Sequence, residues 1–336
     1  MLFENEFMGL NHDEICAIWN IPPLVSVQKP LSGTIHNVFL LITREAKYVL
    51  RIYSYPPEKR FRIVNEHAIA RYVQSHHLPA IAPLPFSSNH ETFLERDGHF
   101  YALYPFAQGE QFSRALLNSN QSDVGEIISA MGRSLAEVHL ALSSYYLPTP
   151  RPLSLVVNRE QTLAKIEALE TAISIRKVLD DLDQQVLGAL RERKQYLLTA
   201  KDVDVSALNA LPWQSLHGDF QETNLFFSHG RVSALIDWDQ ACSGPRAWEL
   251  LRTLHYVFAL DPSRCQRFLN AYQQVFPLPM EELHLTATIY GWVQANNLWG
   301  WRSYYLDNNQ SLRQFLSMSD SQPFMVRWAK LAKMLW

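Results

Sequence analysis

The sequence predicts an α+β fold of two lobes, with a small antiparallel β-sheet and one main helix in the N-terminal lobe and a mainly helical C-terminal lobe. Three observations support this class. Strand-like runs rich in β-branched and aromatic residues are concentrated before Phe106, helical periodicity dominates after it, and 336 residues exceed what one small core usually holds. We therefore expect an N-terminal lobe over residues 1–106 and a C-terminal lobe over residues 107–336.

The N-terminal lobe begins with two expected strands, IHNVFLLIT at 35–43 and KYVLRIY at 47–53, which only the short link REA separates. A helical pattern follows at 61–77 and ends before a proline, a residue that rarely continues a helix. Two further strand-like pieces, at 91–97 and 99–106, flank an Asp-Gly turn. The order strand, strand, helix, strand, strand indicates an antiparallel sheet with one helix packed on it.

In the C-terminal lobe, apolar residues recur at helical spacing over 122–144, and the stretch 158–200, rich in Leu, Glu and Arg, predicts two more helices. Residues 216–227 and 231–239 hold short strand-like runs on either side of a Ser-His-Gly turn, which indicates a second hairpin. From Ala247 onward the pattern is helical and is interrupted by prolines.

The composition excludes several classes of partner. The formal net charge is −3, so no broad basic field is available for nucleic acid. No apolar run approaches the roughly 20 residues that a membrane-spanning helix needs, and the acidic first residues do not resemble a signal peptide. The three cysteines are isolated in sequence, which disfavours a disulfide framework. We expect a cytoplasmic protein that binds neither nucleic acid nor membrane.

One segment, residues 216–240, collects polar side chains between apolar runs. Asp219 and Asn224 precede its first strand and Asp237 ends its second, so a hairpin would bring the three side chains to one end. Carboxylate and amide oxygens suit Mg²⁺, which completes its shell with phosphate oxygens and water, and a further carboxylate can orient a substrate hydroxyl. The alternative is that these residues only cap turns and a helix, which is common for Asp and Asn taken singly.

The motifs of this segment resemble those of a known superfamily. HGDFQETN at 217–224 resembles the catalytic loop of aminoglycoside phosphotransferases and choline kinase-like enzymes, a group that includes type II homoserine kinases. It also fits the protein kinase pattern H-R-D-x-x-x-x-N with Gly in place of Arg. LIDWD at 235–239 resembles the metal-binding segment of that superfamily, and GPRAWELLR from Gly244 resembles the segment that follows it. The resemblance extends over most of the chain and implies a bilobal, protein kinase-like fold.

The resemblance implies a role for each polar residue of the segment. Asp219 would be the catalytic base or the carboxylate that orients the hydroxyl, and Asn224 and Asp237 would hold Mg²⁺ on the phosphates of ATP. Asp239 would contact a second metal ion or shape the site. His217 would brace the loop through hydrogen bonds.

The resemblance also predicts a phosphate site in the N-terminal lobe. The turn Ser32-Gly33-Thr34 offers backbone N–H groups and hydroxyls to phosphate, although a single glycine is also common in ordinary hairpin turns. Arg51 lies where the kinase pattern V-A-I-K has lysine. Arginine can bridge phosphate oxygens in a bidentate manner, but its geometry differs from that of lysine. Glu66, on the helix between the strands, is the expected partner of Arg51.

Aromatic residues supply the remaining binding candidates. The segment LYPFAQGEQF at 103–112 resembles the hinge between the lobes of these enzymes, which implies that Tyr104 and Phe106 contact adenine. Trp292, Trp299 and Tyr304 lie in a segment dense in aromatic residues, and rings of this kind suit sugars or, through cation–π attraction, quaternary amines. The alternative for this last set is packing between helices.

These features predict an ATP- and Mg²⁺-dependent kinase that phosphorylates a hydroxyl of a small metabolite, such as an amino alcohol, homoserine or a sugar. Aminoglycoside phosphorylation is an alternative, which the basic C-terminal tail disfavours because such substrates are polycationic. A kinase-like protein that binds ATP without turnover, and a metal-dependent phosphohydrolase, are two others. Protein kinase activity is disfavoured because no A-P-E segment follows Asp237.

Overall fold

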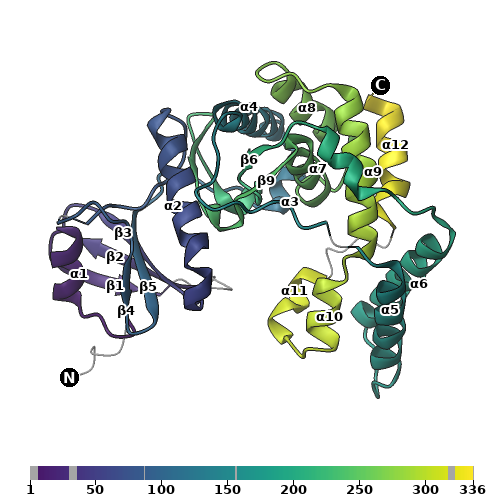
Figure 1. Cartoon of the computed structure of the whole chain (residues 1–336), viewed down its shortest axis with the longest axis horizontal. Helices are drawn as coiled ribbons and strands as arrows, with labels where there is room; N and C mark the ends of the chain where they lie inside the picture. The colour runs from purple at the N-terminus through teal and green to yellow at the C-terminus, as the bar shows by residue number, and fades with distance from the viewer. Residues whose placement is uncertain (1–6, 30–35, 87, 156, 317–321, 336) are drawn as a thin grey trace. The chain divides into compact units, whose positions relative to one another are not determined.

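The structure, a computed structural model, describes residues 7–29, 36–86, 88–155, 157–316 and 322–335 (Figure 1). The chain packs as two compact units. The first comprises Met1–Pro152, Gln214–Ser243 and Arg267–Phe276, and the second comprises Leu153–Trp213, Gly244–Gln266 and Pro277–Trp336. The first unit therefore takes in the whole of the expected N-terminal lobe together with the polar hairpin, and a division at residues 106 and 107 stays a prediction.

The first unit is built on a five-stranded antiparallel sheet with the strand order β1-β2-β3-β5-β4. Its strands are β1 (Leu24–Gln28), β2 (Asn37–Thr43), β3 (Lys47–Tyr53), β4 (Leu94–Arg96) and β5 (His99–Pro105). Arg51 of β3 lies opposite Val38 of β2 and Ala102 of β5. Arg51 is thus in the central strand, where both neighbours fix its register.

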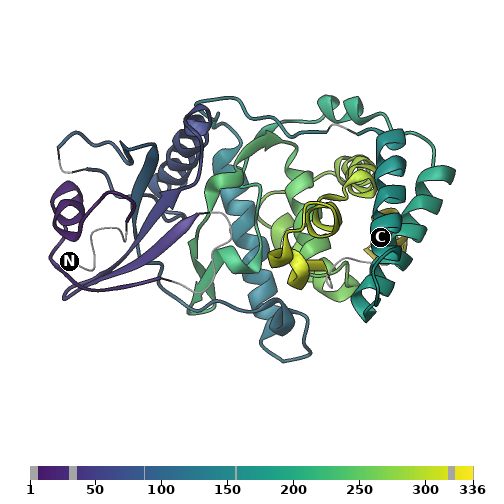
Figure 2. The same cartoon turned by 90° about the horizontal axis from the view of Figure 1, so that it is seen from below.

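Helices cover both faces of this sheet (Figure 2). Because side chains alternate along a strand, Leu50 and Ile52 face one way and pack with Trp19 of α1 (His12–Trp19). Tyr53 faces the other way and packs with Ile63 of α2 (Arg60–Ser75). The strands and α2 are confirmed close to their expected bounds. The short α1 and β1 were not predicted, and they add a helix and an edge strand to the expected sheet.

The rest of the first unit carries the polar hairpin. It contains α3 (Arg114–Leu117), α4 (Val124–Leu142), β6 (Gln214–Leu216), the 3₁₀ turns η3 (Glu222–Asn224) and η4 (Trp238–Gln240), β7 (Leu225–Ser228), β8 (Arg231–Leu235), most of β9 (Cys242–Gly244) and most of α8 (Pro262–Gln273). Strands β7 and β8 pair as the expected hairpin. Single bridges join Ala80 to Leu235 and Glu110 to Phe227, so both chain segments that leave the sheet are hydrogen-bonded to the hairpin.

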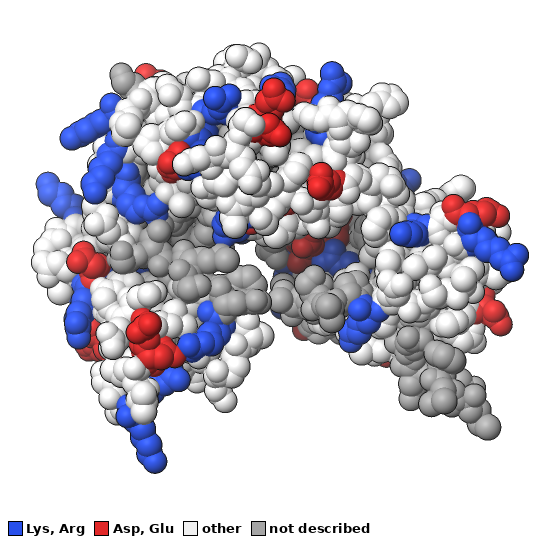
Figure 3. Space-filling view, turned by 180° about the vertical axis from the view of Figure 1, so that it is seen from behind, with Lys and Arg blue, Asp and Glu red and all other residues white. Residues whose placement is uncertain are grey.

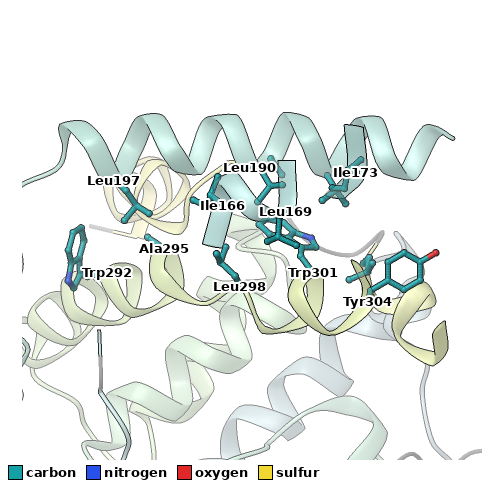
Figure 4. Packing of buried hydrophobic residues seen from close by; sticks show 13 residues of the cluster. Ile166, Leu169, Ile173, Leu190, Leu197, Trp292, Ala295, Leu298, Trp301 and Tyr304 are labelled. Atoms are coloured by element: carbon teal, nitrogen blue, oxygen red, sulfur yellow. The ribbon is translucent and has the colours of Figure 1, made fainter. Parts of the chain in front are cut away.

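The second unit is helical in the part of it that the structure describes. Its helices are α5 (Arg159–Ser174), α6 (Asp181–Thr199), α7 (Arg246–Tyr256), α9 (Met280–Asn296), α10 (Trp299–Tyr305), α11 (Arg313–Leu316) and α12 (Phe324–Leu335), with the 3₁₀ turns η2 (Val205–Ala210) and η5 (Gln310–Leu312). Apolar side chains of α5 and α6 pack against those of α9 and α10, as Figure 4 shows. The two helices expected over 158–200 are α5 and α6.

The charge distribution and the helices concern the two classes of partner that the sequence disfavours, nucleic acid and membrane. On the face drawn in Figure 3, acidic side chains lie among the basic ones. Among the residues that the structure describes, none of the helices is both long enough and apolar enough to cross a membrane.

Candidate active site

The loop between β6 and η3 is tied to the end of β8 by a histidine. His217 is buried, and its Nδ1 accepts a hydrogen bond of 3.1 Å from the backbone N–H of Asp219. Its Nε2 lies 3.0 Å from the backbone oxygen of Ile236, so Nε2 carries the proton and donates. His217 therefore links the loop that carries Asp219 to the residue before Asp237, which is the bracing role expected for it.

Gly218 explains why this loop has glycine where the protein kinase pattern has arginine. Its φ is +83°, in the region that favours glycine. A Cβ at this position would collide with the backbone oxygen of Gln240. The loop and the segment after Asp237 therefore approach each other backbone to backbone, and a side chain cannot be accommodated between them.

The loop holds the Asp219 carboxylate with two side-chain amides. Gln221 Nε2 donates to Oδ2 of Asp219 at 2.9 Å, and Asn224 Nδ2 donates to the same oxygen at 3.1 Å and to the Asp219 carbonyl at 2.9 Å. Because Asn224 uses its amide nitrogen within the loop, its Oδ1 is the atom suited to ligate a cation. The backbone oxygen of Asn224 accepts from the N–H of Ile236 at 3.0 Å, which joins Asn224 to the approach of Asp237.

Asp237 follows β8 in a left-handed backbone conformation, with φ 64° and ψ 63°. Aspartate tolerates this region better than most residues, yet such a conformation usually persists only where the surroundings enforce it. The Asp237 side chain is 43% exposed, and its Oδ1 lies 3.1 Å from Nη2 of Arg51. The structure thus brings Asp219, Asn224 and Asp237 into one hydrogen-bonded assembly at the hairpin.

Arg51 joins this assembly to the sheet and to α2. Its Nη1 lies 2.7 Å from Oε1 of Glu66, while its Nη2 reaches Asp237. The guanidinium is largely buried, at 13% exposed, and the Glu66 side chain is 3% exposed. The planar fork of arginine suits this position because it binds two carboxylates in different directions at once, which a lysine ammonium does less well.

A buried polar cluster surrounds Glu66 on the side away from Asp237. The hydroxyls of Tyr53 and Tyr104 donate to its two oxygens at 3.1 and 3.3 Å, and both hydroxyls lie 3.0 Å from Nε2 of His67. Burial raises the pKa of Glu66 to about 7, against the opposing effect of the Arg51 charge. Burial also lowers the pKa of His67 to about 3, so this imidazole is neutral at physiological pH.

The structure places the two hinge candidates differently. The Tyr104 phenol belongs to the cluster around Glu66, and its backbone lies opposite Val49 in the β3–β5 ladder. Phe106 is half-buried just beyond β5, and its N–H donates to the carbonyl of Lys47 at 3.2 Å. The Lys47 ammonium lies 5.6 Å from the centroid of the Phe106 ring. Contact of either residue with adenine stays a prediction.

The remaining candidates fall into three groups. Ser32, Gly33 and Thr34 fall outside the described residues. The aromatic candidates belong to the second unit. Trp292 and Tyr304 lie in its core (Figure 4) and are 3% and 4% exposed, whereas Trp299 is 66% exposed. Packing accounts for the two buried rings, and a role for any of the three in binding an acceptor stays a prediction. Asp239 is buried in the first unit, against side chains described below.

Several residues of the site were missed from the sequence. Tyr53 shares a strand face with Arg51 because it lies two residues further along β3, so parity could have found it. Arg62 lies four residues before Glu66 on α2, and this helical spacing could have found it too. Gln221 and Arg151 have no such signal, because their contacts depend on how the loops meet.

The donor set suits a magnesium ion shared with a substrate. Among the described positions, no group of three or more His, Cys, Asp or Glu side chains could hold a metal ion. One carboxylate and one amide oxygen, from Asp237 and Asn224, are too few to retain a metal ion alone. They match Mg²⁺, which proteins commonly bind through one or two side chains together with substrate phosphates.

Known proteins are similar to this chain in sequence and in fold. The family model described as "Phosphotransferase enzyme family" matches residues 27–283. A Salmonella typhimurium (strain LT2) protein named serine/threonine protein kinase RdoA is 26% identical over 259 residues, which cover 71% of this chain and 70% of that protein. A Rhizobium etli homoserine kinase is 25% identical over 278 residues, covering 79% and 76%.

A solved structure, spectinomycin phosphotransferase in complex with ADP and spectinomycin, covers 95% of this chain and 96% of its own with a TM-score of 0.63. Its sequence identity of 13% shows a shared fold only. Protein kinase-like architecture is thereby confirmed for the present chain. Because the family model spans most of the sequence, this protein belongs to the phosphotransferase enzyme family, and it is an ATP-dependent phosphotransferase.

Proposed function

We propose that this protein transfers the γ-phosphate of ATP to a hydroxyl group of a small metabolite, with Mg²⁺ as cofactor. The observation that supports this proposal most strongly is the assembly at the hairpin. Asp219 and Asn224 are hydrogen-bonded to each other, Asn224 is joined to the approach of Asp237, and Arg51 reaches Asp237 from the sheet. Phosphoryl transfer depends mainly on positioning and charge neutralisation, and this arrangement supplies both.

In this proposal Asp219 orients the acceptor hydroxyl and accepts its proton. Its Oδ2 is held by Gln221 and Asn224, which fixes the direction of the carboxylate. A fixed carboxylate costs little reorganisation when the hydroxyl approaches, which is the requirement for a positioned general base. Removal of the carboxylate leaves the hydroxyl without a group to orient it.

In this proposal Arg51 and the metal-binding residues together hold the phosphates of the nucleotide. Asn224 Oδ1 and the Asp237 carboxylate would hold Mg²⁺, which when bound neutralises charge on the phosphate oxygens. Arg51 would contribute a bidentate contact to phosphate, while Glu66 keeps its guanidinium in place. The residues proposed for the remaining nucleotide contacts are Ser32, Gly33 and Thr34 for phosphate, and Tyr104 and Phe106 for adenine.

The proposed acceptor is an amino alcohol, a homoserine-like compound or a sugar. The relative named homoserine kinase supports a small hydroxyl compound. The aromatic residues proposed to contact such an acceptor are Trp299, which is exposed, and Trp292 and Tyr304, which are buried. The three cysteines are isolated in the sequence, which is ordinary in cytoplasmic proteins, so we propose that location.

A second candidate acceptor is a serine or threonine hydroxyl of a protein. The relative named serine/threonine protein kinase RdoA favours it, at an identity similar to that of the homoserine kinase. Both candidates use the same phosphate chemistry and differ only in the acceptor. They are separated by the product, which is a small phosphate ester in one case and a phosphoprotein in the other.

The test is ³¹P NMR of the purified protein with Mg-ATP and a panel of homoserine, choline, other amino alcohols, sugars, aminoglycosides and a mixed protein substrate. We expect a phosphate ester from one small acceptor. Asp219→Asn and Asp237→Asn, which preserve side-chain shape, should each reduce the rate by about 100-fold or more, as loss of a positioned group does. A rate that these substitutions leave unchanged contradicts the assigned site. ATP binding without transfer to any acceptor supports a protein that binds nucleotide without turnover.

A further inference from the structure

Helix α2 is linked at two points to residues 237–239, the segment proposed to bind the metal ion. Glu66 and Arg62 are separated by four residues, so they lie one above the other on the same face of the helix. Glu66 acts through Arg51, which reaches Asp237. Arg62 reaches Asp239 directly, with Nη2 at 3.5 Å from Oδ2 and 3.4 Å from its backbone oxygen. The same face of α2 is thus connected to both ends of the segment 237–239, to Asp237 through Arg51 and to Asp239 directly.

Protein donors already engage both carboxylate oxygens of Asp239. The Tyr55 hydroxyl donates to Oδ1, and Gln240 Nε2 donates to Oδ2 at 3.1 Å, beside Arg62. The Asp239 side chain is 4% exposed, whereas that of Asp237 is 43% exposed. A metal ion requires free lone pairs and access to phosphate oxygens. Asp237 meets this requirement better, because the buried carboxylate of Asp239 lacks the access and already accepts from three protein donors.

Arg151 also holds this segment. Its Nη1 donates to the backbone oxygens of Asp239, at 2.5 Å, and Ala241, at 3.2 Å, and its Nη2 donates to Oε1 of Gln240 at 3.1 Å. Arg62 in turn lies over the Tyr55 ring, at 4.8 Å from its centroid. Two guanidinium groups therefore converge on Asp239, Arg62 at its carboxylate and Arg151 at its backbone oxygen, and the buried carboxylate balances their charge.

The backbone of Asp237 needs such support. It is in the left-handed region. The chain is fixed on both sides of it, at Ile236 by a hydrogen bond to Asn224 and at Asp239 by its side-chain contacts. We propose that Asp239 is a positioning residue, which locks the turn at Asp237 onto α2 and Arg151 so that the metal-binding carboxylate and Arg51 are held together. The expected alternative, contact of Asp239 with a second metal ion, does not fit its burial and its partners.

This inference rests on the proposed function, and its test separates the two. The variants are Asp239→Asn, Arg62→Gln, Tyr55→Phe and the double variant Asp239→Asn/Arg62→Gln. Arg60→Gln is the matched control, because Arg60 is on the same helix but pairs at 3.7 Å with Glu95 on the surface. For each variant we would measure kcat and KM for Mg-ATP, the thermal midpoint, and hydrogen exchange of residues 236–241.

We expect Asp239→Asn, Arg62→Gln and Tyr55→Phe to lower kcat/KM for Mg-ATP by about 10- to 100-fold, since displacing a positioned group by about 1 Å can cost that much. The double variant should lose no more than Asp239→Asn alone, because both substitutions remove one shared contact. Exchange at 236–241 should accelerate in all of these variants. Arg60→Gln should match the wild type in each measurement, and Arg62→Lys, which keeps the charge, should retain most of the activity.

Two results would overturn the proposal. Loss of turnover in Asp239→Asn, with Arg62→Gln and Tyr55→Phe like the wild type, would mean that Asp239 acts directly on the metal or nucleotide. Lowered thermal midpoints with unchanged kcat and KM per folded molecule would make the contacts merely structural. If the wild type itself transfers no phosphate, the proposed function fails. The exchange data then still decide, since accelerated exchange supports the positioning role and unchanged exchange refutes it.

Discussion

Glu66 is a buried acid whose ionisation depends on two opposing influences, burial among tyrosines and the charge of Arg51. The cost of desolvation exceeds the attraction, so its pKa is raised rather than lowered. This makes the ion pair of Arg51 and Glu66 sensitive to pH near neutrality. The effect can be separated from other titrating groups by a substitution that removes only this carboxyl.

Glu66→Gln should reveal the raised pKa through stability. A folded state that binds a proton more tightly than the unfolded state loses stability as pH rises through the window between the two pKa values. For Glu66 this window runs from the ordinary value of 4.5 to about 7. We therefore expect the advantage of the wild type over Glu66→Gln in thermal midpoint to shrink as pH rises from 4.5 to 7. An advantage that grows over this range would show that Arg51 lowers the pKa instead.

Gly218 sets how closely the loop that carries Asp219 approaches the segment after Asp237. Gly218→Ala adds a Cβ that collides with the backbone oxygen of Gln240 at a positive φ, so we expect a loss of about 2–4 kcal/mol in the free energy of unfolding together with most of the activity. Gly230→Ala is the matched control. Its φ of +72° is similar, but no atom lies within 4 Å of the added Cβ. Its cost should therefore be only the ~1–2 kcal/mol of the backbone conformation. Denaturant unfolding compares the two, and equal losses would contradict the steric explanation.

Among the secondary-structure elements, those with a long periodic pattern were predicted from the sequence, and the shortest ones were not. The strand expected at 47–53 and the helix expected at 61–77 are β3 and α2, because alternation and helical spacing are each sustained over several residues. Helix α1 has only eight residues, and β1 is an edge strand whose residues are half-buried or exposed. Neither offers a long periodic pattern. The signal that marked α1 was local, a capping box of Asn11 and Glu14.

We expect that capping box to stabilise helix α1. Asn11→Ala removes the acceptor for the Glu14 N–H at the start of the helix, and loss of such a cap typically costs about 1 kcal/mol. Asn11→Asp keeps an acceptor in the same place and should be close to neutral. Hydrogen exchange of α1 measures the local effect, and equal protection in both variants would show that packing of Trp19 and Ile15 alone holds the helix.

The site was predictable where its residues lie close in sequence or share a regular element. The spacing of Asp219, Asn224 and Asp237 along one hairpin indicated their convergence. The resemblance to kinases implied the pairing of Arg51 with Glu66, which lies on the helix between the strands. The contacts of Asp239 were not predictable in this way. They join it to residues as far as 184 positions away, and no periodic pattern links such distant positions.

For the whole molecule, the chain order of the two units governs how the protein is made. The first unit is interrupted twice, after Pro152 and after Ser243, and it resumes for the last time at Arg267–Phe276. A chain that has emerged from the ribosome only as far as Trp213 contains Arg51 and Glu66 but not Asp237, which lies 186 positions beyond Arg51. Contacts this distant in sequence form slowly, because a long loop must close before they can form. The buried ion pair is therefore synthesised long before the hairpin that completes the site. During this interval the growing chain exposes the surface that the hairpin later covers, and exposed surface of this kind favours aggregation until the contacts form.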